Sequence, residues 1–83
     1  MKGGAVERHW ICDPGHCWLV VPLADVEASG YRPTPFSYIA SGWAYLEEDL
    51  DAPEFLKATG DPSPTLRVNV RTHWRRPERT FPE

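Results

Sequence analysis

Nine prolines spread along 83 residues restrict the fold of this chain more than any other feature of its sequence. Proline fixes φ at about −65° and lacks an amide proton, so it ends helices and is excluded from the interior of a sheet. The apolar share of 41%, which includes four tryptophans, still provides enough surface to form a core. We therefore expect one small domain of short elements over residues 1–83, with residues 1–5 and 76–83 flexible.

Two β-hairpins are predicted from turn residues between strand-like segments. The first turn is Asp-Pro-Gly at residues 13–15, in which proline sets the second corner and glycine is free to take positive φ. The second is Ser-Gly at residues 41–42, a two-residue hairpin connection. The predicted arms are residues 6–12 with 17–21 in the first hairpin and residues 36–40 with 43–47 in the second.

Each hairpin is followed by a predicted short helix. Residues 22–30 begin with proline and end with glycine, and in residues 51–60 we expect Asp51 to be the N-cap and Glu54 to complete a capping box. Residues 66–74 alternate apolar and polar side chains, which predicts a half-buried strand. The order ββαββαβ indicates an α+β fold, a mostly antiparallel sheet of about five strands with two short helices on one face.

Charge is distributed unevenly along the chain. Residues 1–70 carry ten acidic and five basic side chains, a net −5, whereas residues 71–83 carry four arginines and two glutamates, a net +2. Arginine, histidine and tryptophan in the last segment are residue types that can bind nucleic acid by phosphate contact and stacking. The acidic body argues against that role, so we expect a protein partner with a basic surface and no direct nucleic-acid binding.

No membrane association is expected. The longest apolar run, Trp18–Leu23, is far shorter than the ~20 residues that span a bilayer. No apolar stretch follows the lysine at position 2, so the sequence has no signal-peptide pattern and a cytoplasmic location is expected.

The stretch CDPGHCW at residues 12–18 concentrates metal-binding and reactive side chains. A zinc site would use His9, Cys12, His16 and Cys17, but the spacing lacks a second ligand pair, so an ordinary turn is favoured. The two cysteines can face each other across the hairpin, although a reducing cytoplasm favours two free thiols. A cysteine nucleophile needs a base within hydrogen-bond reach and an oxyanion hole, and the only evidence for such a Cys-His pair is proximity in sequence, so we expect neither an enzyme nor a cofactor.

The acidic run EEDLD at residues 47–51 has three interpretations. On an extended backbone Glu47, Asp49 and Asp51 would share one face and could bind a hard cation. Alternatively, the run is a solvated edge followed by the helix N-cap, or it is a protein-binding patch.

Two motifs carry a family resemblance: D-x-G-H-x-W-L at residues 13–19, and Y-L-E-E-D-x-D-A at residues 45–52 followed by F-L at 55–56. Over roughly residues 9–58 the chain resembles a group of small proteins encoded by phages and prophages. In that group glycine usually stands at the position of Cys17 and cysteine at that of Leu50. The resemblance therefore implies that the cysteines of the turn form neither a metal site nor a nucleophile.

The resemblance implies an accessory protein of the anti-CRISPR type, which inhibits a bacterial defence complex in the host cytoplasm by stoichiometric binding. Aromatic side chains would anchor the partner, and carboxylates would occupy sites meant for phosphates. Alternatives are a virion or DNA-maintenance protein, a metal-binding or structural phage protein that uses the His/Cys hairpin, and a Cys-dependent enzyme. The expected partner-binding residues are Tyr38, Trp43, Tyr45, Glu47, Glu48, Asp49 and Asp51.

Overall fold

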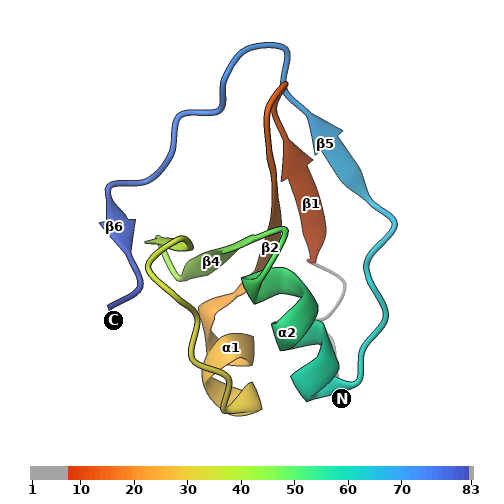
Figure 1. The fold of residues 1–83 in the computed structure, drawn as a ribbon, viewed down its shortest axis with the longest axis vertical. Helices are drawn as coiled ribbons and strands as arrows, with labels where there is room; N and C mark the ends of the chain where they lie inside the picture. The colour runs from red at the N-terminus through yellow and green to blue at the C-terminus, as the bar shows by residue number, and fades with distance from the viewer. Residues whose placement is uncertain (1–7, 83) are drawn as a thin grey trace.

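The computed structural model describes residues 8–82, and Figure 1 shows their arrangement. The described residues form two helices and one six-stranded sheet. In chain order the elements are β1 (His9–Cys12), β2 (Cys17–Pro22), α1 (Leu23–Ser29), β3 (Tyr38–Ala40), β4 (Trp43–Glu47), α2 (Asp51–Thr59), β5 (Arg67–Asn69) and β6 (Arg79–Thr80).

The strand order of the sheet is β5-β1-β2-β4-β3-β6. All neighbouring strands are antiparallel except β5, which runs parallel to β1. The α+β class, the two helices and the mostly antiparallel pairing are confirmed, whereas the sheet is mixed and has six strands where about five were predicted. The difference arises after α2, because the chain returns to the outer edge of β1 and then continues to the outer edge of β3 (Figure 1).

Both predicted hairpins are present. In the first, the Asp13 N–H donates to the His16 carbonyl at 2.9 Å and closes the turn. In the second, Ser41 and Gly42 have φ values of 51° and 81°, the left-handed conformation that a two-residue hairpin turn requires. Of the predicted arm 6–12, residues 6 and 7 lie outside the described residues.

The strand predicted over residues 66–74 is shorter and more exposed than the alternation indicates. Only Arg67–Asn69 pair with β1, and all three residues are exposed. Leu66 and Val68 keep 58% and 44% of their surface accessible. The half-buried assignment is wrong because β5 is an edge strand, and at this edge the alternation does not reflect burial.

The helices cover one face of the sheet, as predicted. On this face Leu19 lies opposite Leu46 on the neighbouring strand, and Val21 lies opposite Ala44. All four side chains are fully buried, at 0% exposure. The core is completed by side chains from α1, α2, β3 and the end of the chain: Val26, Ala52, Phe55, Ile39 and Phe81.

Helix ends agree with the sequence at α1 and differ at α2. At α1, Gly30 has φ of 78° and ends the helix as predicted. At α2 the N-cap position is Leu50 and no side chain caps the helix, so the predicted Asp51 cap with its Glu54 capping box is wrong. Asp51 is instead the first helical residue, and its carboxylate points into the protein.

The Asp51 carboxylate is fully buried, at 0% exposure, and is surrounded by hydrogen-bond donors. Tyr31 Oη donates at 2.6 Å, Thr34 donates through both its N–H and its hydroxyl, and Ser37 Oγ donates as well. Burial, together with the hydrogen bond to Asp51 and its charge, raises the pKa of Tyr31 well above the usual value. Asp51 thus joins α2 to the loop between α1 and β3.

The C-terminal segment packs against the sheet. β6 pairs with β3, the Phe81 N–H donates to the Ser37 carbonyl, and the Phe81 side chain is 7% exposed within the core. In Figure 1 this segment, in blue, runs from β5 over the end of the β1–β2 hairpin to β6 on the opposite side. Residues 79–81 are therefore held by backbone and core contacts where the sequence predicts a flexible end. The predicted flexibility of residues 1–5 lies outside the described residues.

Candidate functional site

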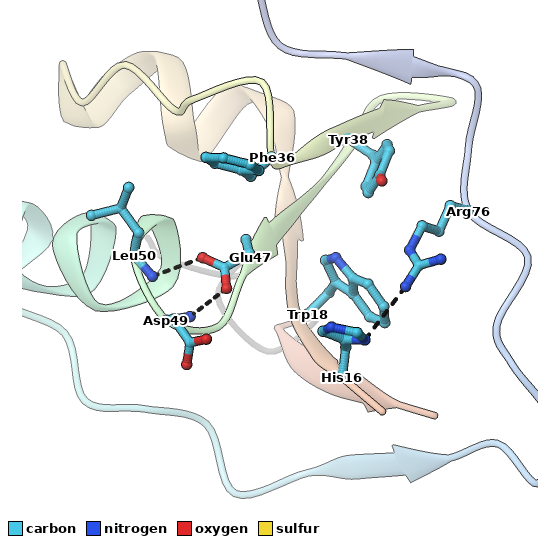
Figure 2. A pocket seen from close by; sticks show the side chains of 8 residues that line it. All are labelled: His16, Trp18, Phe36, Tyr38, Glu47, Asp49, Leu50 and Arg76. Atoms are coloured by element: carbon cyan, nitrogen blue, oxygen red, sulfur yellow. Dashed lines mark hydrogen bonds between the residues drawn. The ribbon is translucent and has the colours of Figure 1, made fainter. Parts of the chain in front are cut away.

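The second face of the sheet carries a groove of about 390 Å³ beside the β1–β2 turn. Figure 2 shows the residues around it, which come from β2, from the segment around β3, from the end of β4 and from the C-terminal segment. Its lining is formed by His16, Trp18, Phe36, Tyr38, Glu47, Asp49, Leu50 and Arg76.

The floor of the groove belongs to an aromatic cluster. Trp18 is 3% exposed, and the ring of Trp74 packs against it at a tilt of 50°, with 4.7 Å between the ring centroids. Trp74 also contacts Tyr45 at 5.0 Å and the edge of Tyr38 at 6.5 Å. These contacts hold Trp74, and with it the segment 70–78, against β2, β3 and β4 on the face opposite the helices.

A cation lies on one wall of the groove. The Arg76 guanidinium lies 4.9 Å from the centre of the Trp18 ring, and its Nη2 is 3.5 Å from His16 Nδ1 (Figure 2). Within residues 8–82, no carboxylate forms an ion pair with Arg76. The guanidinium is thus held in place by aromatic contact while its charge stays available to an anionic group.

Carboxylates lie on the other wall. Glu47 accepts the backbone N–H groups of Asp49 and Leu50 at 2.9 and 2.8 Å, which fixes the loop between β4 and α2 (Figure 2). Asp49 is exposed, and next to it Phe36 and Leu50 are 68% and 43% exposed. Acidic and exposed apolar side chains therefore share this rim.

The structure divides the residues predicted to bind a partner. Tyr38, Glu47 and Asp49 line the groove. Glu48 turns away and accepts the Cys17 N–H at 2.8 Å. Tyr45 lies beneath Trp74, Trp43 lies opposite Pro22 at the far end of the β2–β4 ladder, and Asp51 is buried, so these three are outside the groove.

Five groove residues were not predicted to be partner-binding. The sequence predicts an ordinary turn at His16 and a flexible end at Arg76, and it assigns Trp18 no binding role. The exposed Phe36 and Leu50 carry no local signal, because their exposure depends on the loops that flank β3 and α2. A usable sequence signal for Arg76 is the tryptophan two residues before it, because arginine and tryptophan close together are typical of binding surfaces.

Asp13 holds the turn next to the groove. Its carboxylate accepts the N–H groups of Gly15 and His16, and that of Trp74 from the C-terminal segment, at 2.8 to 2.9 Å. Burial raises the pKa of this carboxyl, but the three N–H donors and the charge of His73 outweigh burial and lower the pKa to about 2. Asp13 therefore connects the turn to the segment that carries Arg76.

The lowered pKa of Asp13 predicts a specific pH dependence of stability. A depressed folded-state pKa stabilises the fold above the unfolded-state value of 3.8, and this contribution is lost as the pH falls toward about 2. We expect the difference in free energy of unfolding between wild type and D13N to be constant near neutral pH and to shrink from about pH 4 to about pH 2. Urea unfolding across this range measures it, with D49N as the control for loss of an exposed charge. A difference that is the same at neutral pH and at about pH 2 would contradict the role of Asp13.

Cys12 and Cys17 form a disulfide, so the expectation of two free thiols is wrong. The two cysteines lie opposite each other in the β1–β2 register, which brings their sulfurs together across the hairpin. The spacing of the two cysteines in the sequence permits this arrangement. Bonded sulfurs are not thiolates, which removes two of the four candidate zinc ligands. Within the described residues, no group of three or more His, Cys, Asp or Glu is arranged to hold a metal ion.

No protein-family model, curated protein or solved structure compared with the chain matches it. Neither of the two helices within residues 8–82 is both long and apolar enough to cross a membrane.

Proposed function

We propose that the protein is a non-catalytic inhibitor that binds a bacterial defence complex of the CRISPR type stoichiometrically, with the groove as its contact surface. The observation that carries the proposal is the rim where exposed Phe36 and Leu50 adjoin Glu47 and Asp49. The resemblance to phage-encoded proteins supports the choice of a defence complex in the host cytoplasm.

The rim combines the two contributions that protein binding uses. An exposed phenylalanine supplies an anchor whose burial by a partner is favourable. The α1–β3 loop that carries Phe36 is held by the hydrogen bonds of Thr34 and Ser37 to Asp51, which lowers the entropic cost of binding. Nearby carboxylates attract a basic surface and guide its approach. A partner segment rich in lysine and arginine, as found where a protein holds nucleic acid, matches this chemistry.

The lining of the groove favours binding over catalysis. Its lining contains no Ser, Cys, Thr or Lys side chain, so nucleophiles of these four types are missing from it. Both carboxylate oxygens of Glu47 accept backbone N–H groups, so this residue is engaged in holding the loop. The floor of the groove is closed, because Trp74 packs against Trp18 and Trp18 is only 3% exposed.

The double variant F36A/D49N tests the rim without disturbing the fold, because both side chains are exposed. We expect wild-type protein produced in a bacterium with an active CRISPR-type system to raise the plaque count of a targeted phage. The variant should weaken binding to the captured complex at least about tenfold, which corresponds to about 1.4 kcal/mol. Plaque assays and titration of the purified complex measure the two effects.

The matched control is L66A/E54Q, which removes one exposed apolar side chain and one exposed carboxylate away from the groove. It should behave as wild type. If both double variants bind as tightly as wild type, inhibition uses another surface. If wild type neither raises the plaque count nor captures a defence complex, the proposed function is wrong.

A further inference from the structure

A positive charge lies against the disulfide, on the face of the sheet that Cys17 shares with the core residues Leu19 and Val21. The Arg67 Nη1 lies 3.3 Å from Cys12 Sγ and 3.8 Å from Cys17 Sγ. Parallel pairing of β5 with β1 places it there, because Arg67 lies opposite Trp10 on the strand that ends at Cys12. A guanidinium stays charged at every accessible pH, so it can stabilise negative charge that develops on either sulfur.

The two sulfurs differ in accessibility. Cys12 is 5% exposed, whereas Cys17 is partly exposed at the start of β2. An incoming thiolate therefore reaches Cys17 Sγ more readily, and the electron pair of the broken bond is left on Cys12 Sγ. That sulfur is the one nearer to Arg67. Exchange is faster when the leaving thiolate is stabilised, so the arrangement favours attack at Cys17.

We propose that Cys12 and Cys17 form a thiol–disulfide exchange site whose substrate is a low-molecular-weight thiol of the glutathione class, with Arg67 stabilising the departing thiolate. In the first step the external thiolate forms a bond to Cys17 Sγ, the Cys12–Cys17 bond breaks, and Cys12 leaves as a thiolate. In the second step another external thiolate attacks the external sulfur of the mixed disulfide and releases Cys17 as a thiolate. The protein disulfide gains two electrons, and two external thiols become one external disulfide, with protons exchanged with water.

The hairpin is held by bonds that do not involve the sulfurs. The Asp13 carboxylate and the Asp13 N–H close the turn, and the Cys17 N–H donates to Glu48. The reduced sulfurs thus stay opposite each other and can re-form the bond when an oxidised thiol is present. The site is separate from the groove, and the inference does not rest on the proposed function.

Reduction kinetics of the full chain test the site. After mass spectrometry has shown the disulfide in air-oxidised protein, excess reduced glutathione is added, and the appearance of protein thiols is followed by alkylation. We expect R67M to slow reduction about threefold or more, since the leaving thiolate loses its nearby charge, and R67K to recover part of the rate. The difference should shrink in about 1 M salt, where the screening length falls to about 3 Å.

The control R32M removes an exposed arginine from the loop between α1 and β3 and should reduce at the wild-type rate. Brief reactions analysed by peptide mapping should find glutathione on Cys17. Thermal unfolding of each variant shows whether β5 is retained; if R67M is unfolded, R67K and the salt dependence of the wild-type rate decide. The proposal is wrong if the air-oxidised protein contains free thiols. It is also wrong if glutathione is found mainly on Cys12, or if wild type, R67M and R32M are reduced at equal rates.

Discussion

Replacing Asp51 with alanine is expected to lower the free energy of unfolding by about 3 kcal/mol or more. The substitution leaves the Tyr31 and Ser37 hydroxyls and both donors of Thr34 without their acceptor inside the protein. Each buried polar group left unsatisfied costs about 1 to 3 kcal/mol. In a domain of this size such a loss lowers the melting temperature by about 12 °C or more, which urea and thermal unfolding both measure.

Two further variants distinguish the effect of losing the buried hydrogen bonds of Asp51 from the effect of losing a negative charge. D49A removes an exposed carboxylate two residues away and should have a small effect, typical of surface substitutions. D51N keeps the volume, but its amide group adds donors where the surrounding groups already donate, so it should also destabilise. A D51A protein as stable as D49A would show that the buried network does not hold the α1–β3 loop to α2.

The second large effect is expected from W74A. Trp74 makes ring contacts with Trp18, Tyr45 and Tyr38, and it is the aromatic side chain that holds residues 70–78 on the second face. Loss of a large aromatic side chain with several ring partners is expected to cost about 2 to 4 kcal/mol. Urea unfolding measures the loss, and a red shift of tryptophan emission should report the exposure of Trp18. Binding through the groove should weaken as well, because Arg76 lies two residues after Trp74 on the same segment.

W43A is the matched control, since it removes a partly exposed tryptophan from the same face, at the end away from the groove. W74F retains an aromatic ring and should recover most of the stability. If W74A is destabilised no more than W43A, and the emission of Trp18 does not shift, the segment 70–78 is held by contacts other than this cluster.

Local structure was largely predictable because short-range signals determine it. The Asp-Pro-Gly turn at 13–15 and the Ser-Gly turn at 41–42 specify their hairpins through backbone conformation alone. Gly30 ends α1 for the same reason, with a positive φ that other residues rarely adopt. These features involve neighbours within a few residues, so no knowledge of the tertiary fold is needed.

The groove was predicted only in part, because long-range contacts form it. The acidic run after Tyr45 did contribute Glu47 and Asp49. Its last carboxylate, Asp51, satisfies the local rule for an N-cap, yet donors from residues 31–37 draw it into the protein. Arg76 reaches the groove because Trp74, more than fifty residues after Trp18, packs against that ring. Neither contact has a signature within a sequence window.

The position of β5 and β6 at opposite ends of the sheet has a consequence for association between molecules. Open strand edges expose unpaired backbone groups that can recruit another chain and start aggregation. Here β1 to β4, which have three to six residues, are enclosed by two strands of three and two residues, each carrying an arginine. Short, charged edge strands are poor templates for pairing, so the last part of the chain limits edge-to-edge aggregation of the hairpins that it encloses.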